Sequence, residues 1–266
     1  MKCIRQPVFR SLAMDLILAT TILATTILAA AVPRLASAPL EVPKISAFAP
    51  AKDLIQQVDF FVGRVEESLA DPKTFDLAKQ SRTLKDGNTL AVLALMLGVH
   101  DENHPLKGSL PTMLAAAQAL ADSGDNAERA LAALAKIKTA RAAGAPDGGA
   151  VKWGKVASLA ALMKQVPLVH AGLKRGVDGN RLARQAVQSA GQSASLAAIA
   201  EAALLDDEYA KSPEDAQNWS RFCIQMRDAA GEVNSAIHAQ DGPRVTAGMK
   251  QLEQSCNACH ARFRSH

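Results

Sequence analysis

Residues 244–264 read RVTAGMKQLEQSCNACHARFR, and this stretch gives the clearest indication of the fold. Its apolar side chains recur at alternating intervals of four and three residues, which is the spacing of one face of an α-helix. The residues on this face are Val245, Met249, Leu252, Cys256, Cys259 and Phe263. Because both cysteines share the apolar face, we expect their thiols to point toward neighbouring helices in the protein interior.

The same stretch contains Cys256-Asn257-Ala258-Cys259-His260, a CxxCH motif. This spacing is typical of c-type haem attachment, in which two thiols add across the porphyrin vinyl groups and the histidine binds iron. Thiol redox chemistry and zinc binding are the alternatives. A thioredoxin-like motif follows a strand, however, and a zinc site needs a further ligand of matching spacing. We therefore expect one covalent haem c.

The N-terminus has the pattern of an export signal. Basic residues precede an apolar run over residues 16–32, and small residues follow it. Cleavage after residues 36–38 (Ala-Ser-Ala) or after residues 29–31 (Ala-Ala-Ala) would remove the run, which is otherwise long enough to anchor the chain in a membrane. Residues 1–38 are predicted to be a signal peptide or membrane anchor and residues 39–50 a linker. The protein is expected in the periplasm, because c-type haem is attached outside the bacterial cytoplasm.

The composition indicates an all-helical protein without an obvious anionic partner. Hydrophobic residues make up 48% of the chain but aromatic residues only 4%, and most apolar positions are Ala or Leu, which favour helices. The formal net charge is +4, and most of the excess lies in the first 38 residues, which carry four basic residues against one acidic residue. The rest is close to neutral, so we expect no nucleic-acid partner.

Past the linker, helical patterns alternate with short segments of Gly, Pro and Asp, and no long period-two alternation suggests a strand. The predicted helices are residues 51–70, 73–101, 107–123, 125–143, 153–175, 180–208, 213–239 and 242–264. The segment 144–152 is rich in glycine and divides them into two groups of four. The predicted fold is therefore all-α: a helical bundle over 51–143, a linker over 144–152, and an antiparallel four-helix bundle over 153–266 that carries the haem.

The two groups of helices have similar sequences. Residues 90–94 (LAVLA) match residues 196–200 (LAAIA), and the same offset pairs Asp101-Glu102 with Asp207-Glu208. This match favours an internal duplication. The stretch of the first copy that corresponds to CxxCH, near residues 141–145, has neither cysteine nor histidine, so the first bundle is predicted to lack haem.

The motif and its flank, residues 256–264 (CNACHARFR), lie at the end of an all-α unit and resemble the cytochrome c′ family and its low-spin relatives. The resemblance covers residues 153–266. It implies haem between the helices of an antiparallel bundle, with Cys256 and Cys259 as thioether positions and His260 as the proximal ligand. It also implies that Arg264 interacts with a haem propionate or with His260.

The sixth iron position separates two functions. In low-spin relatives a methionine on the first helix of the bundle binds iron, which indicates Met163. In cytochromes c′ an apolar side chain leaves the position vacant, a role open to Leu159 or Leu162. His170 is a further candidate ligand, although Pro167 is expected to kink or end the helix just before it.

Other residues have candidate roles that packing explains equally well. Trp219 and Trp153 are expected to pack against the porphyrin or in the core, and Cys223 is expected to be a buried free thiol. His100 and His104 have the i, i+4 spacing of a metal site on a helix, but a proline follows, so we expect them at a helix terminus.

The predicted function is one-electron transfer by an exported monohaem cytochrome with a redox protein as partner, without enzymatic activity. Two alternatives stay open. A vacant sixth position would bind NO or CO, and the bundle without haem could dock a partner protein. A homodimer is a further option, because members of the family often dimerise through bundle faces.

Overall fold

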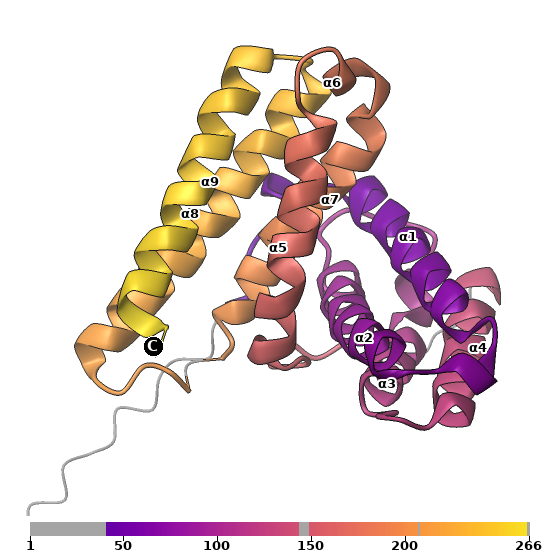
Figure 1. Ribbon diagram of the computed structural model, residues 1–266. Coiled ribbons are helices and arrows are strands. Elements are labelled where there is room, and N and C mark those ends of the chain that lie inside the picture. The colour runs from indigo at the N-terminus through magenta and orange to yellow at the C-terminus, as the bar shows by residue number, and fades with distance from the viewer. Residues whose placement is uncertain (1–40, 144–148, 207, 265–266) are drawn as a thin grey trace, which may run out of the picture. The chain divides into compact units, whose positions relative to one another are not determined.

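The computed structural model describes residues 41–143, 149–206 and 208–264 (Figure 1). All regular elements in these residues are helices, which confirms the all-α prediction. In chain order they are η1 (Ile45–Ala47), α1 (Ala51–Leu69), η2 (Pro72–Thr74), α2 (Leu77–Gly98), η3 (Lys107–Ser109), α3 (Leu110–Ala121), α4 (Ala127–Ala143), α5 (Leu159–Gly176), α6 (Arg181–Arg184), α7 (Ala186–Ala203), α8 (Pro213–His238) and α9 (Gly242–Phe263). The predicted signal peptide or anchor, residues 1–38, lies outside the described residues. Within the described residues, no helix combines the length and apolar character needed to span a bilayer.

Three helices differ from their predicted bounds or continuity. The helix expected over 153–175 begins only at Leu159, because the Ser158 hydroxyl accepts a hydrogen bond from the Ala161 N–H and caps the first turn. Pro167 does not end this helix, which continues to Gly176. The helix expected over 180–208 is divided at Gln185 into α6 and α7. The helix expected over 73–101 begins at Leu77 after a separate 3-10 turn.

Two helices form the centre of the fold. Residues 86–97 of α2 and residues 189–203 of α7 are buried on every face. Such all-round burial is what a helix of Ala, Leu and Ser tolerates, since small side chains let neighbouring backbones approach closely. The matching segments 90–94 and 196–200 therefore occupy equivalent central positions in the first helical group (α1–α4) and the second helical group (α5–α9).

Residues Glu41–His266 form one compact unit, and a single core cluster contains residues from both helical groups. α1 packs against α7, and α2 packs against α5 and α7. In both contacts a side chain of the second group donates a hydrogen bond to the first group. Ser195 of α7 donates to Gln57 of α1 across 3.2 Å, and Gln165 of α5 donates to Asp86 of α2 across 3.2 Å. Part of the predicted linker, residues 144–148, lies outside the described residues. The division into two domains stays a prediction, while the packing shows that the groups share a core.

The two helical groups differ where their first and last helices meet. In the first group, α1 packs against α4, and ion pairs join Arg141 to Asp59 and Lys138 to Glu66 across the contact. In the second group, the equivalent helices α5 and α9 do not pack closely along their length. A cavity lies between α5 and α9, and residues of the CxxCH motif line it.

Candidate functional site

α9 places both cysteines of the motif on its apolar face, as the sequence pattern predicts. The Asp241 side chain accepts a hydrogen bond from the Arg244 N–H and caps the helix, and Pro243 occupies its first turn. Val245, Met249 and Leu252 are buried on the apolar face. Further along the same face Cys256 and Cys259 are half-buried, and His260, one position round, is exposed.

The cavity beside the motif, which we call the Cys-His cavity, has a volume of about 370 Å³. Its lining comes from α5, α7, α8 and α9: Met163, Val166, Pro167, His170, Ala200, Ala203, Trp219, Phe222, Cys223, Met226, Glu253, Ser255, Cys256, Asn257, Cys259 and His260. The sequence-predicted candidates Cys256, Cys259, His260, Met163 and Trp219 thus surround one space. The small side chains of α7 leave this space open.

A second hollow of about 510 Å³, here the aromatic hollow, adjoins the Cys-His cavity and shares some of its walls. The shared residues are Met163, Pro167, Trp219, Cys259 and His260. The aromatic hollow adds Arg264, the remaining predicted candidate, together with Lys164, Tyr209 and Phe263. Arg262 does not line the aromatic hollow, because its guanidinium pairs with the carboxylates of Glu214 and Asp215 at 3.0 Å each.

Aromatic rings close the end of the cavity where α9 finishes. Trp219 is 5% exposed, and its Nε1–H donates to the Ala203 carbonyl across 2.9 Å. Tyr209 stacks on the Trp219 ring with centroids 6.0 Å apart, and Phe263 meets it edge-on at 5.2 Å. Trp153, by contrast, is not a lining residue: it lies in the irregular segment before α5 and packs against the main core.

The thiols in the cavity are protonated at neutral pH. Burial, reinforced by Cys256, raises the pKa of Cys259 to about 11, and burial raises that of Cys256 as well. Cys223, from α8, has its pKa raised to about 12 by burial and by nearby Cys259. Catalytic thiols of redox enzymes have lowered pKa values instead. The raised pKa values therefore do not favour thiol–disulfide catalysis at these cysteines.

Among the described residues that line the cavity, one buried side-chain nitrogen or oxygen has no hydrogen-bond partner, the Nε2 of His170. Burial also lowers the pKa of this imidazole, so it is neutral at neutral pH. At the rim, Glu253 pairs with Lys174 of α5 across 2.9 Å, which joins the two helices on either side of the cavity.

The other histidine pair is structural. The Nε2 atom of His100 lies 2.9 Å from the Ala49 carbonyl oxygen, and that of His104 lies 2.8 Å from the Leu97 carbonyl oxygen. Both residues follow the end of α2, as the sequence predicts. In the part of the chain that the structure describes, no group of three or more His, Cys, Asp or Glu side chains converges to hold a bare metal ion.

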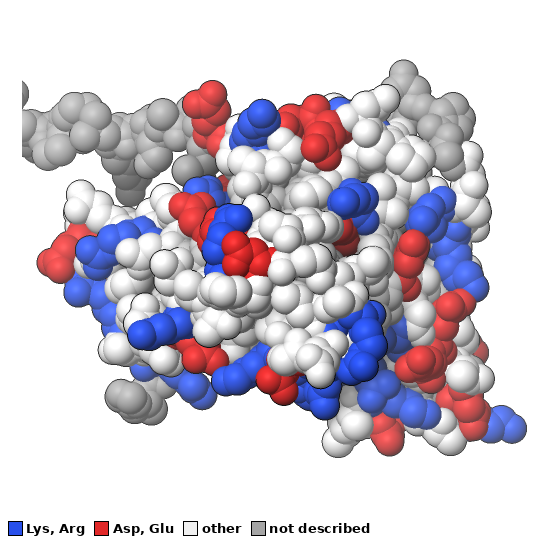
Figure 2. Space-filling model, turned by 90° about the horizontal axis from the view of Figure 1, so that it is seen from above, with Lys and Arg blue, Asp and Glu red and all other residues white. Residues whose placement is uncertain are grey.

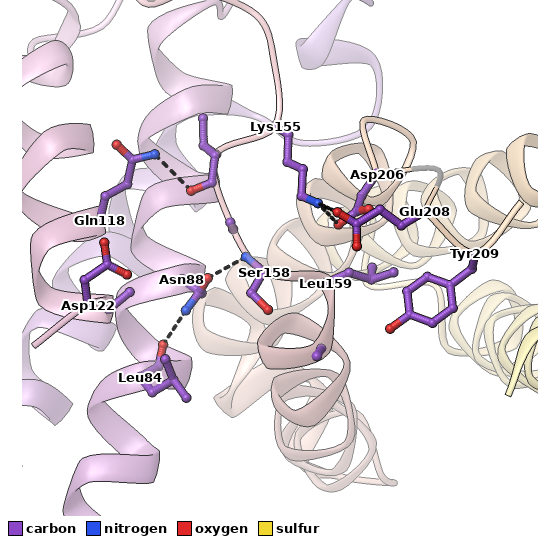
Figure 3. Close-up of a pocket in the computed structure, with 14 residues that line it drawn as sticks. Leu84, Asn88, Gln118, Asp122, Lys155, Ser158, Leu159, Asp206, Glu208 and Tyr209 are labelled. Atoms are coloured by element: carbon purple, nitrogen blue, oxygen red, sulfur yellow. Dashed lines mark hydrogen bonds and ion pairs between the residues drawn. The ribbon is translucent and has the colours of Figure 1, made fainter. Parts of the chain in front are cut away.

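A further pocket of about 760 Å³ lies where the irregular segment before α5 crosses the α2–α3 pair (Figure 3). Lys155 pairs with Asp206 at 2.9 Å and with Glu208 at 2.6 Å. On the other side, the Ser158 N–H donates to Asn88 across 2.7 Å. Leu159 and Tyr209 line both this pocket and the aromatic hollow, whereas Cys256, Cys259 and His260 do not line the pocket. The hydrogen bond from Ser158 to Asn88 joins the segment before α5 to α2.

The surface of the described residues carries charges of both signs. Figure 2 shows basic and acidic side chains interspersed over the face seen from above. This agrees with the near-neutral composition of the chain after residue 38. Comparisons of the chain with protein-family models, with curated proteins and with solved structures found no match.

Proposed function

We propose that this chain is an exported c-type cytochrome that holds one covalent haem between α5 and α9 and transfers single electrons. The observation that carries the proposal is that both cysteines and the histidine of the CxxCH motif line one apolar cavity. The aromatic hollow adjoins that cavity, and each of the two has a volume within the range of small-molecule and cofactor sites, about 300–1,000 Å³.

The residues present fit such a group. Cys256 and Cys259 lie on the cavity side of α9, where their sulfurs would form the thioether bonds, and His260 would be the axial ligand from the same helix. Ala200 and Ala203 on α7 occupy little of the space. When bound, haem would supply an Fe(III)/Fe(II) couple that no side chain provides.

The remaining side chains would control the environment of that couple. Trp219, Phe222 and Met226 give apolar walls that exclude water, which favours the less charged reduced form. Arg264 lines the aromatic hollow, where its guanidinium would offset the charge of a propionate. Tyr209 is 44% exposed and stacks on buried Trp219, so this end of the cavity would be the edge nearest to a redox partner.

Two earlier expectations belong to this proposal. Location in the periplasm rests on residues 1–38, which lie outside the described residues. The alternative of partner docking by the first helical group is constrained by the packing, because α1 and α2 are already used against α5 and α7.

The test is covalent haem attachment in a host that matures c-type cytochromes. The purified protein is expected to keep haem on a denaturing gel, to show the pyridine haemochrome spectrum of a doubly thioether-linked haem, and to be reduced reversibly by a mediator. Cys256→Ala with Cys259→Ala should abolish attachment, whereas the control Cys223→Ala should retain it. A soluble, folded protein without bound haem would overturn the proposal and return the cysteines to thiol or metal chemistry.

A further inference from the structure

We infer that His170 of α5 is the second axial ligand, so that the iron would be held between two imidazoles, His260 from α9 and His170 from the facing helix. This inference rests on the proposed function and assigns the sixth iron position. For that position the resemblance to low-spin relatives indicated Met163, with a vacant site and His170 as the alternatives.

The Nε2 of His170 is an unpartnered nitrogen beside the CxxCH motif. The Nε2 atoms of His100, His104 and His238 each lie within 2.9 Å of a backbone carbonyl or carboxylate oxygen. The Nδ1 of His104 is also buried without a partner, but His104 does not line the Cys-His cavity. The Nε2 of His170 is buried at the Cys-His cavity and has no such partner among the described residues. A buried polar atom without a hydrogen bond costs free energy unless a ligand satisfies it. The thioether of Met163 needs no partner, so packing accounts for its place.

The positions of His170 and Met163 along the bundle axis can be compared with that of His260. α5 and α9 run in opposite directions, and the Lys174–Glu253 ion pair sets their register. His260 lies seven residues after Glu253, so it stands opposite the residue seven before Lys174, which is Pro167, within about one helical turn. His170 and Met163 are each within about a turn of that level, and both line the cavity with His260.

The directions in which the side chains lean distinguish His170 from Met163. Side chains in an α-helix lean toward the N-terminus of their own helix. Because the helices are antiparallel, His260 leans toward the level of His170, and His170 leans back toward Pro167. The two imidazoles therefore converge. Met163 leans toward Leu159 and away from this level.

A second imidazole has chemical consequences. A six-coordinate site with strong ligands on both faces would be low-spin and closed to CO, and its potential would be lower than that of a His/Met site. The inference thus favours electron transfer over gas binding.

The experiment compares ferric and reduced spectra of the wild-type holoprotein with those of His170→Gly and the matched control Met163→Leu. The wild type should show a low-spin bis-imidazole electron paramagnetic resonance signal and an absorption spectrum that CO does not change. His170→Gly should become high-spin, should bind CO, and should return to low spin when imidazole is added. Met163→Leu should remain low-spin and closed to CO.

The result that would overturn the assignment is a high-spin wild type, or a sulfur-to-iron charge-transfer band that disappears in Met163→Leu. A loss of low spin in His170→Gly that added imidazole does not restore would also count against it. The haemochrome assay is scored first and independently. A protein without covalent haem fails the proposed function itself, whereas a haem protein with the wrong coordination fails only the inference about His170.

Discussion

Gln165 of α5 donates a hydrogen bond to Asp86 of α2 across 3.2 Å, and both side chains are fully buried where the two helical groups meet. Arg64 of α1 approaches the other carboxylate oxygen at 3.2 Å. Burial raises the pKa of Asp86 from 3.8 to about 6, against the opposing effect of the basic residues nearby. The Asp86 carboxylate of α2 thus contacts both α5 and α1, and its burial costs desolvation free energy.

This relationship predicts the effect of pH on stability. Because the native pKa of Asp86 is raised, the folded protein binds the proton more tightly than the unfolded chain does. The contribution of Asp86 is therefore most favourable below about pH 4 and is lost as the pH rises through about 6. Asp86→Asn should flatten this dependence and raise the free energy of unfolding at pH 7.5 by roughly 1–2 kcal/mol, after the lost contact with Arg64 is deducted. Urea unfolding of the wild type and the variant at pH 5 and 7.5 measures the free energy of unfolding at each pH.

The control for this variant is Asp59→Asn, which removes an exposed carboxylate that pairs with Arg141. It should change the free energy of unfolding by less than about 1 kcal/mol at either pH. If Asp86→Asn destabilises the protein at pH 7.5, the carboxylate is a net stabilising group and our account of it is wrong.

Asn234 of α8 gives a second prediction. Its Nδ2 donates to Asp53 and to the Ala190 carbonyl, at 2.8 Å each, and the side chain is 3% exposed. Asn234→Ala leaves two buried acceptors with fewer partners, so it should lower the free energy of unfolding by about 1–3 kcal/mol. Thermal unfolding measures the change. Gln217→Ala, on the exposed side of the same helix, should have little effect.

Two glycines provide a matched pair. A Cβ on Gly87 of α2 would lie 2.7 Å from the Ala121 backbone nitrogen, whereas a Cβ on Gly63 of α1 would meet nothing within 4 Å. Gly87→Ala should therefore destabilise the protein by about 1–3 kcal/mol. Gly63→Ala should stabilise it by about 0.5–1 kcal/mol, because alanine loses less backbone entropy in a helix. Equal effects of the two substitutions in denaturant titrations would show that the α2–α3 contact is not close-packed.

The cavity itself can be tested by filling it. Ala200 of α7 is fully buried and lines the Cys-His cavity. Ala200→Leu should reduce the fraction of protein that acquires covalent haem several-fold, because the added atoms occupy the space between the helices. Ala247→Leu, on the exposed face of α9, should leave the fraction unchanged. The ratio of haemochrome to total protein measures both, and normal haem content in Ala200→Leu would contradict the location of the site.

Helices were predictable wherever a local pattern sufficed. The stripe from Val245 to Phe263 depends only on neighbours three and four residues apart, so α9 is found within a residue of its predicted bounds. The start of α5 depends on Ser158, whose cap competes with a helical pattern that begins earlier. The break at Gln185 has no comparable signal in the sequence.

The site was predictable in part for the same reason. CxxCH is a local motif, so Cys256, Cys259 and His260 could be named from the sequence. Trp219 and Met163 line the same cavity, and Arg264 lines the adjoining hollow. Phe222 and Met226 also line the cavity but were not named as site residues, although their helical spacing places them on one face of α8.

By itself, the sequence determined the helical class, the position of the motif on an apolar face and the difference between the two helical groups at the motif. Each of these depends on residues within a few turns of one another. Only the tertiary structure decided that α5 stands apart from α9, that Gln57 and Gln165 join the two groups, and that the His170 nitrogen has no partner among the described residues. These features depend on how helices far apart in the chain pack, and packing is set by the combined shapes of many side chains rather than by any local pattern.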